Sequence, residues 1–168
     1  RDIKKAIDSI NLIEDIDEAF LGPSCYELRL GNVYYDLTEG NKRIELNDSE
    51  KVIIKPGHLV VLITKEKLKM PNYLTGRVVS KGSLFSIGLT PVCTNVDPGF
   101  EGNMGIVLQN ISRKYIELPQ GEALVKIEFC KLLSEPSKIY NGQHGFQTNI
   151  WPIKEHLQKE HEEFLNDK

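Results

Sequence analysis

Residues 68–129 read LKMPNYLTGRVVSKGSLFSIGLTPVCTNVDPGFEGNMGIVLQNISRKYIELPQGEALVKIEF, and this stretch decides the fold class. Its apolar runs are short, and several alternate apolar with polar side chains, as in LTGRVV, MGIVLQN and ALVKIEF. Turn-forming triplets separate the runs, among them Asp-Pro-Gly at 97–99 and Pro-Gln-Gly at 119–121. A period of two is typical of half-buried strands, and many closely spaced short strands favour a sandwich or barrel over a parallel sheet with crossover helices.

The strand pattern continues upstream of residue 68 and gives way to helical spacing at both ends. Between residues 25 and 64 the short apolar runs are CYELRL, VYYDL, KVIIK and HLVVLIT. Residues 2–10 have apolar side chains at helical spacing, and the charged tail after Pro152 favours a helix. We expect one domain over 1–168, with an N-terminal helical segment at 1–22, a β core at 23–135, and a C-terminal closing segment with a helical tail at 136–168.

Composition excludes several classes of protein. The 168 residues are 40% hydrophobic and 27% charged, which is ordinary for a soluble globular domain. A net charge of −3 argues against a protein that coats nucleic acid. No apolar run approaches the roughly 20 residues of a membrane helix, and the first residues lack the apolar core of a signal peptide. We expect a cytoplasmic protein that binds neither nucleic acid nor membrane.

The cysteines and histidines do not form a zinc site. Cys25, Cys93 and Cys130 are odd in number and widely spaced, which is typical of reduced cytosolic thiols. Zinc-dependent nucleobase deaminases need a His/Cys/Cys ligand set with a P-C-x-x-C motif, and no cysteine here has that spacing. His156 and His161 lie five residues apart, which is not the spacing of a helical metal pair. No zinc is expected.

Three further segments complete a family pattern. Residues 23–31 read PSCYELRLG, residues 70–76 read MPNYLTG, and residues 140–147 read YNGQHGFQ. In order and spacing these segments, together with 68–129, resemble the dCTP deaminase and dUTPase superfamily over nearly the whole chain. The resemblance implies a mainly β fold, the distorted β-barrel or jelly roll of the dUTPase-like type, with short helices at both ends. It also implies a homotrimer whose active sites are shared between subunits.

The phosphate motif departs from the family. Deaminases have R-S-S-x-x-R-x-G-L, and this chain has KGSLFSIGL at 81–89. Lys81 replaces an arginine that binds phosphate, so a positive charge remains but the bidentate fork is lost. Gly82 replaces the first serine, and Ser83 retains the second. Ser86 replaces the arginine that helps to organise the reacting water in deaminases.

The glutamate that activates water in deaminases is also missing. Counted without gaps from DPGFEG at 97–102, its position falls on Val107, and IELP at 116–119 keeps the register downstream. Valine has no proton to give or accept, so general acid–base deamination cannot run through it. Together with Gly82 and Ser86, Val107 predicts that deamination is impaired or lost, and enzyme activity stays an open question.

Asp97 keeps a second chemistry open. Residues 97–110 read DPGFEGNMGIVLQN, which is closer to the dUTPase pattern D-x-D-Y-x-G-x-V-x-V-x-L-x-N than to a deaminase. In dUTPases the equivalent aspartate is the general base for attack on the α-phosphate, and the aromatic residue, here Phe100, stacks on the deoxyribose. The local alternatives are an ordinary Asp-Pro-Gly turn and a core phenylalanine.

Three functions remain open at this point. The first is a dCTP deaminase-like protein that binds dCTP or dUTP without efficient deamination. The second is a Mg²⁺-dependent dUTP/dCTP diphosphohydrolase with Asp97 as the general base, and Mg²⁺ would be held through the nucleotide phosphates. The third is a noncatalytic structural or regulatory subunit. The predicted nucleotide-binding residues are Lys81, Gly82, Ser83, Asn95, Phe100, Gln109, Asn110, Tyr140 and Gln147.

Overall fold

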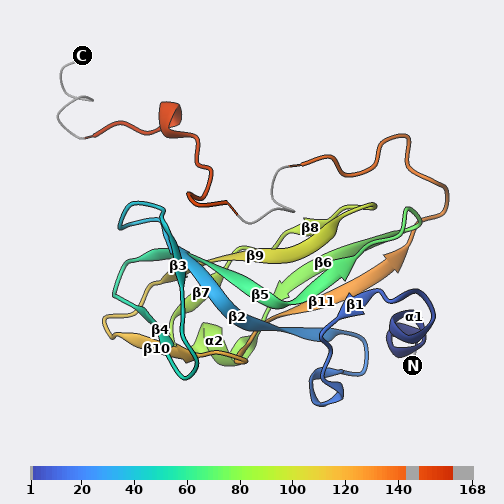
Figure 1. Cartoon of the computed structure of the whole chain (residues 1–168), viewed down its shortest axis with the longest axis horizontal. Helices are drawn as coiled ribbons and strands as arrows, with labels where there is room; N and C mark the ends of the chain where they lie inside the picture. The colour runs from blue at the N-terminus through green and yellow to red at the C-terminus, as the bar shows by residue number, and fades with distance from the viewer. Residues whose placement is uncertain (1, 143–147, 161–168) are drawn as a thin grey trace.

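The computed structural model describes residues 2–142 and 148–160, and its centre is one curled antiparallel sheet (Figure 1). The main path of the sheet runs β7-β9-β5-β2-β11-β6-β8, with β1 on β5 and β3 on β2. The strands of this sheet are β1 (Ile13–Glu14), β2 (Tyr26–Asp36), β3 (Arg43–Glu45), β5 (Leu59–Lys69), β6 (Leu74–Ser80), β7 (Leu89–Pro91), β8 (Asn95–Val96), β9 (Glu101–Asn110) and β11 (Ala123–Lys131). A separate two-stranded sheet pairs β4 (Lys51–Ile54) with β10 (Ile116–Pro119).

Short helices flank the strands. The helices are α1 (Asp2–Ile10), η1 (Glu18–Phe20), α2 (Gly82–Ser86) and η3 (Glu155–Leu157). The helix expected at residues 2–10 is therefore confirmed, and Ile7 of α1 packs into the core. The expected fold class, mainly β with short helices at both ends, is also confirmed. In the tail, the described residues after Pro152 contain only the single turn η3, and residues 161–168 lie outside the described range.

The two edges of the sheet are tied together by three residues. β7 is one edge and β8 is the other, yet only residues 92–94 separate them in the chain. The Val92 amide donates to the Val107 carbonyl on β9 at 2.9 Å, and the Val78 amide on β6 donates to the Thr94 carbonyl at 2.8 Å. Three residues span only about 10 Å. The sheet must therefore curl until its edges nearly meet, and we call this place the seam.

Alternation along the strands separates an inner face from an outer one. On β9, Met104, Ile106 and Leu108 point into the main core, where their neighbours include Val60 and Leu62 of β5. The intervening side chains face the opposite side of the sheet, as the period of two requires. There, a second apolar cluster consists of buried Val33, Tyr35, Val61 and Ile63, with partly buried Leu37, Val107 and Trp151 packed on it.

One strand differs from the expectation of separate short strands. The runs CYELRL and VYYDL lie in a single strand, β2, whose pairing with β5 shifts register between Leu30 and Tyr34. Gly31 lies at this shift, and a Cβ there would be 3.0 Å from the carbonyl oxygen of Ile63. The glycine permits a close approach of two backbones, so it bends the strand without ending it.

A buried ion pair crosses the sheet beneath the N-terminal segment. Glu66 is fully buried and Arg29 is 6% exposed, and Arg29 Nε donates to a Glu66 carboxylate oxygen at 2.5 Å. The Arg29 backbone amide donates to the other oxygen at 2.8 Å, and the Tyr26 hydroxyl donates to the first at 3.1 Å. The remaining guanidinium nitrogens contact the carbonyl of Asp15 at 2.5 Å and the carboxylate of Asp17 at 3.4 Å. The buried charges are therefore paired and hydrogen-bonded on every side.

Burial raises the pKa of the Tyr26 phenol to about 12. The phenol therefore keeps its proton and remains a donor to Glu66 through the neutral range. Its oxygen in turn accepts the Asp17 amide at 3.0 Å, which fastens the loop before β2 to the ion pair.

Two further properties follow from the described residues. All three cysteines are free thiols; Cys25 is buried, while Cys93 and Cys130 are exposed. Within residues 2–142 and 148–160, no helix is both long and apolar enough to cross a membrane.

Candidate functional site

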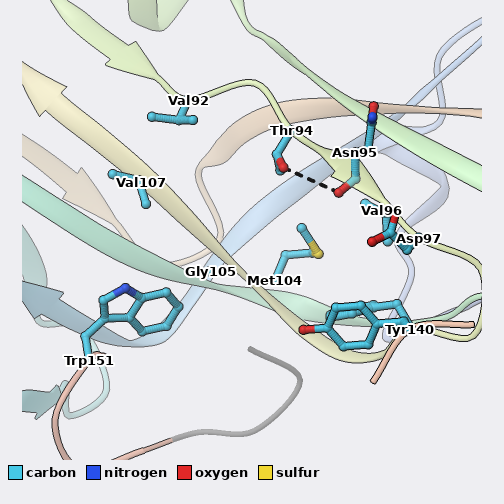
Figure 2. Close-up of a pocket in the computed structure, with 11 residues that line it drawn as sticks. Val92, Thr94, Asn95, Val96, Asp97, Met104, Gly105, Val107, Tyr140 and Trp151 are labelled. Atoms are coloured by element: carbon cyan, nitrogen blue, oxygen red, sulfur yellow. Dashed lines mark hydrogen bonds between the residues drawn. The ribbon is translucent and has the colours of Figure 1, made fainter. Parts of the chain in front are cut away.

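A cavity of about 390 Å³ lies at the seam, bounded by β9, the β7–β8 connection and two C-terminal side chains (Figure 2). Its volume falls at the lower end of the range typical of small-molecule sites. The lining residues are Val92, Thr94, Asn95, Val96, Asp97, Phe100, Met104, Gly105, Val107, Tyr140 and Trp151. Four of the predicted site residues, Asn95, Asp97, Phe100 and Tyr140, are therefore brought together here.

A tight turn presents Asp97 and Phe100 to the cavity. The Phe100 amide donates to the Asp97 carbonyl at 3.1 Å, and Gly99 between them has a φ of +82°. This left-handed conformation favours glycine. A Cβ on Gly99 would also meet Ile139 at 3.1 Å, so the turn has room only for glycine against the C-terminal segment. Asp97 therefore lies in a turn and also lines the cavity, and its catalytic role stays a prediction.

The aromatic pair at one side of the cavity joins the turn to the C-terminal segment. The rings of Phe100 and Tyr140 are 5.2 Å apart between centroids and meet edge to face at 69°. The Tyr140 amide donates to the Pro98 carbonyl at 2.8 Å, which fixes the ring beside the turn. Phe100 is only 5% exposed, so it is a core side chain whose one edge lines the cavity.

Asp97 is the charged side chain among the residues that line the cavity. It is exposed, and within the described parts of the chain its carboxylate has no hydrogen-bond or ion-pair partner. The floor beside it is apolar, because Met104, Gly105 and Val107 line that side. Over the part of the chain that the structure describes, the cavity presents the Asp97 carboxylate beside an apolar wall, and Val107 adds no acid–base group.

The phosphate motif lies apart from this cavity in the single chain. Lys81 precedes the first turn of α2, and its ammonium forms an ion pair with Glu27 at 2.5 Å. The two side chains are similarly buried, with 21% of Lys81 and 22% of Glu27 exposed. A Cβ on Gly82 would have open space around it, and the Ser83 carbonyl accepts the Ser86 hydroxyl at 2.8 Å. Nucleotide binding at Lys81, Gly82 and Ser83 stays a prediction.

Asn110 and Gln109 also lie away from the cavity. Asn110 is fully buried, and its amide donates to the carbonyls of Ile54 at 2.9 Å and Lys114 at 2.8 Å. Its oxygen accepts from the Ser112 amide and hydroxyl, so the side chain organises the turn after β9. Gln109 is exposed at the end of the strand. Gln147 lies outside the described residues, and binding by these three amides stays a prediction.

Trp151 and Gly105 are among the lining residues that the sequence-based prediction did not include. Trp151 is the single tryptophan of the chain and belongs to no segment of the family pattern. Gly105 carried a usable signal, because a glycine inside an alternating strand often marks close approach of another group. Here that group is the Trp151 ring, since a Cβ on Gly105 would lie 2.4 Å from its Cη2 atom.

One cluster among the described residues has the donor types of a metal site. Oxygen and nitrogen atoms of Asp36, Glu39 and His58 lie within 4.8 Å of one another. They are already engaged, because Asp36 accepts from His58 Nδ1 at 2.8 Å and from the amides of Thr38 and Glu39 at 2.9 and 3.2 Å, and Lys55 pairs with Glu39. The cluster is a hydrogen-bonded turn outside the cavity.

Comparison with known proteins points to one family. Residues 1–132 match the family described as dCTP deaminase-like. The dCTP deaminase of Pyrococcus horikoshii is 32% identical over 139 residues, which are 83% of this chain and 87% of that protein.

Two solved structures share the fold at low sequence identity. The 2'-deoxycytidine 5'-triphosphate deaminase of Agrobacterium tumefaciens superposes with a TM-score of 0.66 at 15% identity, over 79% of this chain and 47% of the other. The match thus spans about half of that longer chain. The dUTPase of Streptococcus mutans superposes with a TM-score of 0.53 at 18% identity, over 73% of this chain and 93% of the other. The chain belongs to the dCTP deaminase-like family.

Proposed function

We propose that this protein of pyrimidine deoxynucleotide metabolism binds dCTP or dUTP in the seam cavity and deaminates cytosine poorly or not at all. One observation carries the proposal. Asp97, Phe100 and Tyr140 line a cavity of nucleotide-site type, while its wall has Val107 where deaminases have their catalytic glutamate. These residues support nucleotide binding, and the valine argues against proton transfer to the base.

Deamination needs a group that moves protons between water and the base. General acid–base catalysis contributes about 10²–10⁴-fold in rate, and a valine contributes none of it. Ser86 cannot replace the arginine that the family uses, because it is short, uncharged and bonded to the Ser83 carbonyl. The family relationship therefore supports nucleotide binding more strongly than it supports deamination.

The charge of the cavity supports a site completed by a second copy of the chain. A triphosphate is strongly anionic, and no lysine or arginine is among the described residues that line the cavity. Lys81 and Ser83 lie beside an exposed apolar patch formed by Phe85, Ile87 and Ile111. Such patches mark interaction surfaces. In the homotrimer that we propose, this patch is covered and Lys81 reaches the neighbouring cavity.

Light scattering checks this assembly directly. We expect a particle of three times 19.1 kDa, with Lys81→Ala leaving the mass unchanged and weakening nucleotide binding. Lys42→Ala serves as the matched control, because Lys42 lies outside both the patch and the cavity and should change neither mass nor affinity. A monomeric wild-type protein that binds nucleotide tightly would contradict the shared site.

Magnesium fits the residues present. Mg²⁺ usually binds nucleotides through their phosphates and one or two carboxylates, and Asp97 offers one exposed carboxylate in the cavity. When bound, the ion would neutralise phosphate charge and orient the phosphate groups. Asp97 would hold the ion or take a proton, but one carboxylate does not do both at once without a shared water.

A diphosphohydrolase is the second candidate, and Asp97 favours it because its carboxylate has no partner among the described residues. In this reaction a water oxygen bonds to the α-phosphorus, the bond to the pyrophosphate oxygen breaks, and Asp97 accepts the proton of the water. The products are the monophosphate and pyrophosphate. Phe100 and Tyr140 would hold the sugar side of the substrate while the reaction proceeds.

Incubation with dCTP or dUTP and Mg²⁺, followed by chromatography of every nucleotide, tests both candidates. The main proposal expects saturable binding of the nucleotide by calorimetry and no dUTP formed from dCTP. Release of monophosphate and pyrophosphate, abolished by EDTA, would establish the hydrolase. Formation of dUTP would overturn the impaired-deaminase proposal, and absence of any nucleotide binding would leave a noncatalytic subunit.

A further inference from the structure

Trp151 closes one end of the seam cavity and lies opposite the Phe100–Tyr140 pair. Figure 2 shows the indole at one end of the cavity and Tyr140 at the other, with Met104 and Gly105 between them. The distance available for a ligand ring is therefore set by one aromatic wall at each end. Trp151 lies after the last segment of the family pattern, which ends at residue 147.

The Trp151 indole packs against the backbone of Gly105, which has no side chain. A Cβ on Gly105 would lie 2.4 Å from Cη2 and 3.1 Å from Cζ3 of the indole, and 3.1 Å from Val61 Cγ1. Two carbon atoms cannot approach to 2.4 Å without a covalent bond, so an alanine there and the ring in this position exclude one another. The glycine on β9 and the tryptophan form one fitted pair, although 45 residues of chain lie between them.

The backbone around Trp151 is held from several directions. The Trp151 amide donates to the Asn41 carbonyl at 2.9 Å, and the Arg43 amide donates to the Asn149 carbonyl at 2.9 Å. The Tyr35 hydroxyl donates to the Thr148 carbonyl, and the Tyr35 ring lies 5.3 Å from the indole at a tilt of 55°. These contacts fix residues 148–151 against the β2–β3 connection. The wall is therefore positioned by the fold before any ligand binds.

We infer that Trp151, seated on Gly105, limits the cavity to a single-ring base and makes this protein select pyrimidine over purine deoxynucleotides. The inference rests on the proposed function and adds the residue that sets the size limit. A cavity of about 390 Å³ is near the lower bound for small-molecule sites, and both of its ends are aromatic. Removing the indole would join the cavity to the space over Tyr35 and Val61, which is where a second ring of a purine would have to extend.

Calorimetric titration of dUTP and dGTP into wild-type protein and Trp151→Ala tests the size limit. The wild type is expected to prefer dUTP by tenfold or more, because an apolar pocket discriminates by about 10–200-fold per methylene-sized difference. Trp151→Ala is expected to reduce this ratio about tenfold by gaining dGTP affinity. Leu157→Ala is the matched control, since Leu157 is 71% exposed on the same segment and should leave the ratio unchanged.

Gly105→Ala moves the same wall without deleting it. The new methyl group is expected to push the indole off β9, which raises acrylamide quenching of the single tryptophan in the absence of nucleotide. The dUTP to dGTP ratio should fall as it does in Trp151→Ala. A urea midpoint close to that of wild type shows that the variant is folded. If Gly105→Ala unfolds, the ratio of dUTP to dGTP affinity in Trp151→Ala still tests the size limit.

The outcomes distinguish the size limit set by Trp151 from the proposed nucleotide binding. Tight dUTP binding with an unchanged dUTP to dGTP ratio in Trp151→Ala overturns the size limit and leaves the proposed function standing. Equal binding of dUTP and dGTP by the wild type overturns it as well. No binding of either nucleotide by the wild type overturns both, whatever the quenching of Gly105→Ala shows.

Discussion

Replacement of Glu66 by alanine is expected to lower the free energy of unfolding by about 3–5 kcal/mol, the usual cost of breaking a buried ion pair on one side. Glu66 is fully buried, and Arg29 beside it is 6% exposed. Without the carboxylate, the guanidinium charge stays buried with one acceptor fewer, and both the Arg29 amide and the Tyr26 hydroxyl lose their partner. An unsatisfied buried donor adds its own desolvation cost.

Urea unfolding monitored by circular dichroism measures this change. Glu117→Ala is the matched control, because Glu117 forms an exposed ion pair with Lys51 at 3.2 Å and its removal should leave the urea midpoint nearly unchanged. Glu66→Gln keeps the shape of the side chain and part of its hydrogen bonding. Its loss of unfolding free energy should therefore fall between those of Glu66→Ala and Glu117→Ala. A Glu66→Ala midpoint equal to that of the control would contradict a structural role for the pair.

The Tyr26 phenol makes the stability of the Arg29–Glu66 network depend on pH. Its pKa is raised to about 12 by burial, above the ordinary value of 10.0. A raised folded-state pKa contributes stability that is complete below the unfolded-state value and is lost as pH rises through the folded-state value. The network should therefore hold through neutral pH and weaken between about pH 10 and pH 12.

Any dUTP hydrolysis by this protein is expected to fall about 10²–10⁴-fold in Asp97→Asn, the range that a positioned general base contributes. Asparagine keeps the size of the side chain and cannot accept the proton of the attacking water. The turn should survive, because Asp97 holds it through its backbone carbonyl, which accepts the Phe100 amide. The loss should therefore appear in kcat, with dUTP affinity changed only a few-fold.

Pyrophosphate release with and without Mg²⁺ measures this effect, and calorimetry measures the affinity. Glu101→Gln is the matched control, because Glu101 lies four residues from Asp97 yet pairs with Lys67 at 2.8 Å outside the cavity. It should retain full activity. Full hydrolysis by Asp97→Asn would remove Asp97 from the role of general base and would direct attention to a group from a neighbouring subunit.

Local pattern predicted a mainly β sandwich or barrel, and the family resemblance narrowed this to the dUTPase-like fold. Alternating runs with turn triplets predicted the strands, and helical spacing predicted α1 at its observed bounds. The residues of the turn at 97–100 are neighbours in sequence, so their joint presence at one place needed no knowledge of the fold. The prediction of Asn95 came from the same short segment, whereas the prediction of Tyr140 came from the family pattern.

Long-range packing accounts for what the sequence did not reveal. Arg29 and Glu66 are 37 residues apart, and an isolated glutamate in a strand gives no sign that it will be buried. Gly105 and Trp151 meet only after the C-terminal segment has returned to β9. Asn110 ends a strand in a manner that suits either a ligand or a turn, and only its four hydrogen bonds to neighbouring groups reveal the turn.

The three-residue seam gives the curled sheet one mechanically soft direction. β7 is held by β9 and β8 by β6, and across residues 2–142 no ladder of backbone hydrogen bonds joins β7 to β8. Widening the seam therefore strains a short connection without breaking any strand pair, whereas distortion elsewhere must break a ladder. A ligand that contacts both edge strands would resist this widening. The stiffness of the curled sheet should therefore rise as the cavity is occupied.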